Sequence, residues 1–323
     1  MTKLPPPPFF ILRGHEGVIT ALHFTEEIDD SISSRPSLIS GSRTGEIFIW
    51  NLKTFRTNYR FEGHSKQSIL FLNYYQSSLL SQGRDGTLNI WKFLDQQWIV
   101  IRKFQSSNVG FCPAKLYFTN NVANIVLFND TAHELRIYNY ENENMHGKLK
   151  MEICVGMCMC IKAIQIKEKN FILTGYESGD VGLWNCESLQ EISRQKLHKE
   201  EPVMCLDYDS ECKNRGISGS VAKRLETWTI TENLEIGKVK TIDISNPGIN
   251  VVKIREDRKI VITAGIDFKI RVFSWKSMKL LAILDFHRLP IQCLSFCSEL
   301  VAKQNSVFAS GSEDKCIALW SLY

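Results

Sequence analysis

The sequence predicts an all-β fold, a seven-bladed β-propeller closed by an N-terminal strand that completes the last blade. Residues 61–92 contain short apolar runs separated by turns, the pattern of three antiparallel strands. A closing aromatic residue recurs at spacings of 41, 47, 46, 44, 45 and 47 residues, at Trp50, Trp91, Tyr138, Trp184, Trp228, Phe273 and Trp320. A hydroxyl residue stands ten residues before six of these aromatics, at Ser40, Ser81, Thr174, Ser218, Thr263 and Ser310. A period of about 40–45 residues is that of a four-stranded propeller blade, so seven aromatics predict seven blades.

The stretch at residues 61–92 is the clearest repeat unit. Its first two segments, Ile69 to Leu72 and Leu79 to Gln82, consist almost entirely of apolar residues. Such segments are typical of strands that are covered on both faces. Arg84-Asp85-Gly86 predicts a tight turn before the third strand. A single unit of this kind cannot bury both of its faces, so it predicts neighbouring copies of itself.

The chain is expected to hold a proline-rich segment, 1–8, and one propeller domain, 9–323. Pro5 to Pro8 predict an extended, stiff spacer, with a ligand for a proline-binding domain as the alternative. Phe9 to Arg13 has the pattern of a strand, whereas blade seven has only three strands of its own. The N-terminal strand is therefore predicted to supply the fourth, which covers an edge that would otherwise favour aggregation.

Composition and charge narrow the functional classes. The chain has 323 residues, of which 44% are hydrophobic and 23% charged, as in an ordinary globular protein. No apolar run reaches the length of a membrane span and no signal-peptide pattern is present, so an intracellular protein without membrane contact is expected. The 10 cysteines include Cys205, Cys293 and Cys316 in strand-like segments, which favours buried free thiols. A net charge of +4 with interspersed signs predicts no direct contact with nucleic acid.

Three connections complete the chain. The polar stretch 25–37 is too hydrophilic to pack and carries an acidic group of Glu26, Glu27, Asp29 and Asp30. Residues 141–148 (ENENMHGK) are expected to form an exposed connection after blade three, the least regular blade. Residues 231–248 are expected to hold an outer strand and a loop that ends in a turn at Asn246-Pro247-Gly248.

With these residues in place, the chain resembles the WD40-repeat family over essentially its whole length. In that family a His, a Ser or Thr, an Asp and a Trp form a buried hydrogen-bonded tetrad in each blade. The resemblance implies a complete tetrad in blade two, of His64, Ser81, Asp85 and Trp91. In blade seven it implies Ser310, Asp314 and Trp320, with His287 as a more distantly placed fourth member.

The other blades depart from the tetrad pattern. Blade one has His15, Ser40 and Trp50, but Thr44 stands where Asp is expected. Blade six keeps Thr263 and Asp267 and has Phe273 in place of Trp, and blades three, four and five are more degraded.

Two groups of residues could in principle carry chemistry. His64, Ser81 and Asp85 are the residue types of a hydrolytic triad, but the serine lies within a strand and its hydroxyl recurs in five other blades, which favours a structural network over catalysis. Cys154, Cys158 and Cys160 could form a thiolate metal site, but paired ligands and a fourth partner are missing, so buried strand positions are favoured. Phosphate-binding loops are absent from the sequence. No catalytic, cofactor or metal residue is therefore predicted.

The remaining candidate is a binding surface. The residue before the Asp position of each turn between the second and third strands is expected on one rim of the propeller. These rim residues are Arg43, Arg84, Glu177, Val221, Ile266 and Glu313. Arg43 and Arg84 belong to neighbouring blades and are the predicted partner-binding residues, with two solvated arginines as the alternative. The acidic group after Phe24 is the rival surface.

The first two blades resemble a narrower family. The segments PPPPFFILRGHEGVITALHF, SGSRTGEIFIWNLKT and LLSQGRDGTLNIW are similar to those of the fungal ASTRA-associated WD-repeat subunits and their animal relative, the G-protein beta-subunit-like protein. The resemblance implies a non-catalytic nuclear adaptor, with a cytoplasmic pool as a variant, linked to chromatin remodelling and to maturation of phosphatidylinositol-3-kinase-related kinases. It implies a monomeric propeller within a hetero-complex, whose partners are helical-repeat subunits of that assembly.

Two other functional classes are built on similar propellers. A WD40 substrate receptor of a cullin-type ubiquitin ligase is the alternative, but such receptors carry an Asp after the closing Trp, and this chain has other residues there, Asn51, Lys92, Asn185 and Ser321. A heterotrimeric G-protein beta subunit needs an N-terminal coiled-coil helix, which thirteen residues with four prolines cannot form.

Overall fold

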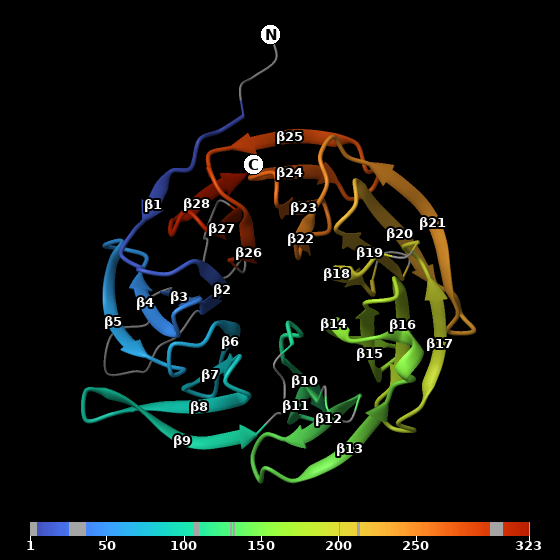
Figure 1. Cartoon of the computed structure of the whole chain (residues 1–323), viewed down its shortest axis with the longest axis horizontal. Coiled ribbons are helices and arrows are strands. Elements are labelled where there is room, and N and C mark those ends of the chain that lie inside the picture. Colours follow the sequence, from blue (N-terminus) through green and yellow to red (C-terminus); the bar gives the residue numbers. More distant parts are fainter. Residues whose placement is uncertain are drawn as a thin grey trace. The chain divides into compact units, whose positions relative to one another are not determined.

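The computed structural model describes residues 5–25, 37–105, 110–129, 131, 133–199, 201–211, 214–297 and 306–322. These residues form seven four-stranded sheets, each built mainly from consecutive strands (Figure 1). The predicted all-β, seven-bladed propeller is confirmed. Residues 26–36, which include the predicted acidic group, lie outside the described residues. Thr25 and Ser37, the two ends of the predicted polar connection, are buried strand residues.

The chain divides into two compact units, one of residues 1–105 and 255–323 and the other of residues 106–254. The single domain predicted for residues 9–323 stays a prediction. None of the helices among the described residues has the length and hydropathy of a membrane span.

The first unit contains blades one, two and seven and most of blade six. Blade one consists of β2 (Ile19–Thr25), β3 (Ser37–Ser42), β4 (Glu46–Asn51) and β5 (Arg56–Glu62). Blade two consists of β6 (Ile69–Tyr75), β7 (Ser78–Gly83), β8 (Thr87–Leu94) and β9 (Gln97–Gln105). Blade six contributes β23 (Ile260–Gly265), β24 (Lys269–Ser274) and β25 (Leu280–Asp285). Blade seven has β26 (Ile291–Phe296), β27 (Ser306–Ser312), β28 (Ile317–Leu322) and β1 (Phe10–Leu12).

The second unit contains blades three, four and five and the first strand of blade six. Blade three consists of β10 (Lys115–Thr119), β11 (Val122–Asn129), β12 (Glu134–Asn139) and β13 (Met145–Lys150). A 3-10 turn, η2 (Ile153–Val155), leads to blade four, β14 (Cys158–Ile166), β15 (Lys169–Tyr176), β16 (Asp180–Asn185) and β17 (Glu191–Lys196). Blade five consists of β18 (Val203–Asp209), β19 (Arg215–Ser220), β20 (Arg224–Ile230) and β21 (Ile236–Asp243), and β22 (Ile249–Ile254) follows.

Burial explains why the second and third strands read as nearly continuous apolar runs. All six residues of β3, and all six of β7, are buried, and each of these strands lies between two hydrogen-bonded partner strands inside its sheet. The fourth strand of a blade is mostly exposed, as in β5. The expected loop 141–148 is therefore partly wrong: β13 is a polar outer strand, and polar outer strands share their composition with loops.

The N-terminal strand completes blade seven as predicted. β1 pairs antiparallel with β28 in the register Phe10–Leu319, Ile11–Ala318 and Leu12–Ile317 (Figure 1). Leu12 is 1% exposed and packs in one core cluster with Ile317 and Leu319. The polyproline segment at residues 5–8 lies outside the sheet.

A β-bulge after the first residue of the first strand recurs in blades one, two, four, five and seven. In three of these blades it places a buried cysteine against the next blade. Cys160 and Cys205 donate S–H contacts of 3.3 and 3.8 Å to the carbonyls of Val203 and Ile249, and Cys293 reaches the carbonyl of Ile19 at 3.8 Å. These cysteines are free thiols, as predicted, and they pack at seams between blades.

Candidate functional site

The structure brings together the four residues predicted in blade two. The Nδ1 atom of His64 lies 3.0 Å from a carboxylate oxygen of Asp85, and its Nε2 atom lies 2.8 Å from Oγ of Ser81. The indole N–H of Trp91 donates to the same Oγ at 2.8 Å. Because the carboxylate only accepts, Nδ1 carries the ring proton, and the Ser81 hydroxyl donates to Nε2. Every polar atom of this network then has a partner.

The His–Ser–Asp geometry is that of a hydrolytic triad, but its surroundings exclude that use. Ser81 is 0% exposed, and its Oγ atom also accepts a hydrogen bond from the Trp91 indole. A nucleophile needs an open approach and a nearby oxyanion site. The network therefore serves the fold.

Blade seven contains a second complete network. His287 lies 2.8 Å from Asp314 through Nδ1 and 2.8 Å from Ser310 through Nε2. Trp320 donates to Ser310 at 2.9 Å. His287, the more distantly spaced residue, thus occupies the same place as His64 in blade two.

Both aspartates are held ionised by their neighbours. Burial raises the pKa of Asp85, but the His64 ring together with the side chain and backbone N–H of Thr87 outweighs burial and leaves the pKa below its usual value. Burial also raises the pKa of Asp314. Hydrogen bonds and the charge of His287, together with the backbone N–H groups of Cys316 and Arg288, outweigh it and leave that pKa below its usual value. Each carboxylate therefore stabilises the fold above about pH 4, and this contribution is lost as the pH falls below that value.

Replacing either aspartate by alanine should destabilise the fold without affecting any chemistry. In Asp85→Ala the His64 ring and the Thr87 N–H lose their acceptor, which costs about 1–3 kcal/mol. Asp314→Ala should behave alike. Thr44 occupies the same slot in blade one, where it does not contact the histidine, so Thr44→Ala is the matched control and should cost about 0.5 kcal/mol or less. Urea unfolding measures the free energy of unfolding of all three variants. An equal loss in the two aspartate variants and in Thr44→Ala would show that the carboxylates do not support the networks.

Blade one forms a partial network. His15 lies 2.7 Å from Ser40, and Trp50 donates to Ser40 at 2.8 Å. With threonine in the Asp slot, Nδ1 of His15 has no hydrogen-bond partner among the described residues, and the nearest carboxylate, that of Glu46, is 4.0 Å away. Burial, followed by the charge of Arg60, lowers the pKa of His15 to about 3, so the ring is neutral.

Blade five contains a histidine that the sequence analysis missed. His198 lies 2.9 Å from Ser218 through Nε2, and burial, with a smaller effect of Lys238, lowers its pKa to about 4. The indole N–H of Trp228 has no partner among the described residues, and its ring stacks on Tyr208 instead. Its position in the sequence could have identified it, because His198 precedes β18, the first strand of blade five, by the same short interval that separates His64 from β6.

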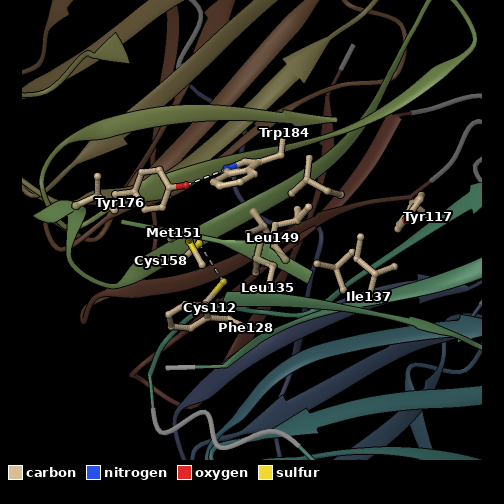
Figure 2. Packing of buried hydrophobic residues seen from close by; sticks show 14 residues of the cluster. Cys112, Tyr117, Phe128, Leu135, Ile137, Leu149, Met151, Cys158, Tyr176 and Trp184 are labelled. Carbon is tan, nitrogen blue, oxygen red and sulfur yellow. Dashed lines mark hydrogen bonds between the residues drawn. The ribbon is translucent and has the colours of Figure 1, made fainter. Parts of the chain in front are cut away.

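Blades three and four replace the network with other contacts (Figure 2). In blade four the Trp184 N–H donates to the hydroxyl of Tyr176 at 2.9 Å and to that of Thr174 at 3.3 Å, whereas in blades one, two and seven it donates to a serine. In blade three Phe128 takes the hydroxyl position and joins an apolar cluster with Leu135 and Ile137. Apolar packing in blade three, and hydrogen bonding to a tyrosine in blade four, therefore occupy the position of the histidine network of the other blades.

In blade six Asp267 has a different partner from the tetrad aspartates of blades two and seven. Asp267 is present, but it forms a buried ion pair with Arg271, with a closest approach of 2.5 Å, rather than joining Thr263 in a histidine network. A bidentate arginine satisfies both carboxylate oxygens, so no histidine is needed.

The three cysteines weighed as a metal site do not converge. Cys154 is exposed, Cys160 faces blade five, and Cys158 packs on Cys112 with the two sulfurs 3.8 Å apart (Figure 2). Burial raises the pKa of Cys158 and Cys160 well above the usual value, so both are neutral thiols. In the described part of the chain no group of three His, Cys, Asp or Glu residues has the geometry to hold a metal ion.

Four of the six predicted rim residues share one backbone arrangement. The N–H groups of Arg43 and Arg84 donate to the carbonyls of Val18 and Ser68, just before the first strand of the same blade, and those of Glu177 and Glu313 do likewise. At this turn position the backbone is therefore held in the same way from blade to blade, while the side chain differs.

The two predicted arginines differ in their surroundings. The Arg43 side chain is 55% exposed and pairs with Glu313 of blade seven at 3.0 Å, whereas Arg84 is half-buried. Glu313 also accepts a hydrogen bond from Gln292 at 3.0 Å. The surface is therefore a mixed-charge patch in which Arg43 is the more accessible cation.

Comparison with known proteins gives consistent matches. The family model described as WD domain, G-beta repeat matches residues 278–321, which include β25, β26, β27 and all but the last residue of β28. Guanine nucleotide-binding protein subunit beta-like protein 1 of Mus musculus is 36% identical over 99% of this chain and 97% of its own length. ASTRA-associated protein 1 is 26% identical in Schizosaccharomyces japonicus and 23% in Schizosaccharomyces pombe, each over 98% of this chain and 99% of the relative.

Proposed function

The chain belongs to the WD40-repeat family of guanine nucleotide-binding protein subunit beta-like protein 1, and on that premise we propose that it is a non-catalytic scaffold for protein–protein interaction in an ASTRA-like complex. The observation that carries the proposal is the end-to-end similarity to proteins named ASTRA-associated. The proposed complex is nuclear and links the chain to chromatin remodelling and to maturation of phosphatidylinositol-3-kinase-related kinases. Its partners in this proposal are helical-repeat subunits, with the chain present as a single copy.

The side chains support a scaffold over an enzyme. Residue types that could catalyse hydrolysis are used inside the blades, where Ser81 and Ser310 are 0% exposed. What the blades present to solvent is a set of backbone-fixed turns with variable side chains. Rigid loops with variable side chains are suited to selective binding.

The proposed contact surface is the turn between the second and third strands of blades one and two, with Arg43 and Arg84 at its centre. Arginine is favoured at interface hot spots because its planar head binds carboxylates in two places and its stem packs on apolar surface. Partner carboxylates would compete with Glu313 for Arg43, which selects for an acidic partner.

Charge reversal tests this surface. Arg43→Glu with Arg84→Glu should weaken partner capture about 30-fold, equal to about 2 kcal/mol, if the two arginines are anchors. Part of the loss should disappear at high salt, because exposed charges are screened. Pulldown of partners from a lysate and circular dichroism of the variant are the two measurements.

The matched control is Lys53→Glu with Lys92→Glu. Both lysines are exposed: Lys53 follows β4, and Lys92 lies in the second half of β8. The double change alters the net charge by the same amount as the arginine variant. Equal binding by both double variants would remove the arginine surface from consideration, whereas a loss confined to the arginine variant supports it.

Affinity purification with mass spectrometry distinguishes the proposed complex from the alternative. Recovery of ASTRA or kinase-maturation subunits supports the proposal. Recovery of cullin adaptors would instead favour a ubiquitin-ligase receptor, and measurable hydrolase turnover by the purified protein would contradict a scaffold.

A further inference from the structure

The connection between blades three and four, residues 151–157, carries the most exposed large apolar side chain among the described residues. It joins β13 to β14 through the 3-10 turn η2, and Ile153, the first residue of that turn, is 77% exposed. We call this connection the 151–157 loop. It lies within the second unit and shares no residue with the Arg43 surface.

Ile153 stands at a sequence position that other blades give to the network histidine. It precedes the first residue of β14 by five positions (158 − 153), as His64 precedes that of β6 and His198 that of β18. Both histidines are buried and hydrogen-bonded to a serine. In blade four Trp184 donates to Tyr176 instead (Figure 2), so the blade needs no histidine at this position and the isoleucine is left in solvent.

Hydrogen bonds hold the 151–157 loop in one conformation. The Val155 N–H donates to the Glu152 carbonyl at 3.3 Å, and the Val155 carbonyl accepts the Ser178 N–H at 3.1 Å. The Met157 N–H donates to the Glu177 carboxylate at 3.2 Å, and the Glu177 N–H donates to the Met157 carbonyl at 2.9 Å. Val155 is 3% exposed and belongs to the apolar cluster of blades three and four. Little conformational entropy is lost when a partner binds a loop that is already ordered.

Carboxylates outnumber cations beside the 151–157 loop. The Glu152 side chain is 64% exposed, and Glu177, whose carboxylate contacts the loop backbone, is exposed as well. Arg194 lies 2.8 Å from Glu152 and 3.4 Å from Glu191, so one guanidinium is shared by two of the three carboxylates. Like charges that meet across an interface are unfavourable, so this surface favours a partner with lysine or arginine.

We propose that the 151–157 loop inserts Ile153 into an apolar pocket of a protein partner, with lysine or arginine at the rim of the pocket facing Glu152 and Glu177. The inference rests on the proposed scaffold function and adds a second contact, in the second unit, to the same complex. A few side chains buried at the centre of an interface supply most of its binding energy, and charges at the rim mainly set the rate and specificity of association. An ordered loop with one apolar side chain and flanking carboxylates has both parts.

Cys154 reports whether the loop is covered. It follows Ile153 directly, and it alone is exposed among the described cysteines. Iodoacetamide should alkylate it in the free full-length chain and about tenfold more slowly in the complex purified with the tagged chain, because alkylation needs an accessible thiolate. Mass spectrometry measures both rates.

Equal rates of Cys154 alkylation in the free chain and in an intact complex would overturn this inference and leave the proposed function standing. A tagged chain that purifies without any stoichiometric protein partner would overturn both.

Ile153→Ser removes the anchor, and Val239→Ser is its matched control, because Val239 is a 57% exposed apolar residue on β21 of the same unit. Ile153→Ser should lower the recovery of the subunits that protect Cys154 about tenfold, whereas Val239→Ser should recover them like the wild type. Both side chains are exposed, so neither change should move the melting temperature of the free chain, which circular dichroism measures. Equal recovery by the two variants would overturn the inference.

Glu177→Gln tests the basic rim of the partner. The amide oxygen can still accept the Met157 N–H, so the loop keeps its support while one charge is lost. Recovery of the partner should fall at low salt, and the difference from the wild type should disappear at high salt, because exposed charges are screened. Glu168→Gln changes an exposed carboxylate in the turn between β14 and β15 and is the matched control. Equal salt dependence of the two variants would overturn the assignment of a basic rim.

Discussion

Deleting residues 1–13 should leave the protein aggregated, whereas deleting residues 1–8 should leave its melting temperature nearly unchanged. The longer deletion removes β1, so Leu12 leaves its core cluster and the backbone of β28 loses its partner. Loss of a buried leucine alone costs about 2–5 kcal/mol, and an unpaired apolar edge recruits other chains. The shorter deletion removes no residue of any sheet among those described.

Size-exclusion chromatography and thermal melting distinguish the two truncations. Leu12→Ala is an intermediate case, because it keeps the backbone pairing and removes only the side chain, so it should lower stability by about 2–5 kcal/mol without aggregation. Two truncations with equal melting temperatures and equal solubility would show that β1 does not hold blade seven closed.

Lowering the pH from 7 to 5 should reduce the free energy of unfolding by about 4 kcal/mol, about 2 kcal/mol for each of His15 and His198. Both rings stay neutral in the fold, because their pKa values are about 3 and about 4. In the unfolded chain a histidine pKa is about 6.5, so below that pH the unfolded state binds more protons. Their stabilising contribution is therefore complete above about pH 6.5 and is lost as the pH falls toward their folded values.

Urea unfolding at several pH values between 5 and 7 measures this loss. His198→Gln should halve the pH dependence, and the double variant with His15→Gln should nearly abolish it, whatever the stability of each variant at pH 7. His146→Gln changes an exposed histidine and is the matched control, which should keep the full dependence. An unchanged dependence in the double variant would show that these two rings do not cause it.

The features that repeat in every blade were predictable from sequence. Spacing of the closing aromatics and hydroxyls located the second and third strands, because both strands are buried on two faces and their composition is constrained throughout. The closure by β1 was predictable for a related reason: an apolar strand at one end and a blade one strand short at the other must pair to cover their edges.

Features that depend on one blade's own surroundings were not predictable. His198 follows a leucine rather than the glycine that precedes His15 and His64, so its role was hidden in a degraded repeat. Arg271 reaches Asp267 across a turn, and nothing in the spacing distinguishes that arginine from a surface residue. Lys162 and Asp207 lie on the first strands of two different blades, and only the packing of these strands shows that the two charges meet.

The pairing of β1 with β28 also bears on how the chain is made. Leu12 and its partner Ile317 are 305 residues apart (317 − 12). At synthesis rates of about 5–20 residues per second, β1 leaves the ribosome roughly 15–60 s before its partner exists. During that interval Phe9, Phe10 and Leu12 belong to an apolar segment without its final neighbour. The last blade can form only after β28 has been synthesised. A chaperone that shields residues 9–13 until then would therefore act on the step that completes the fold.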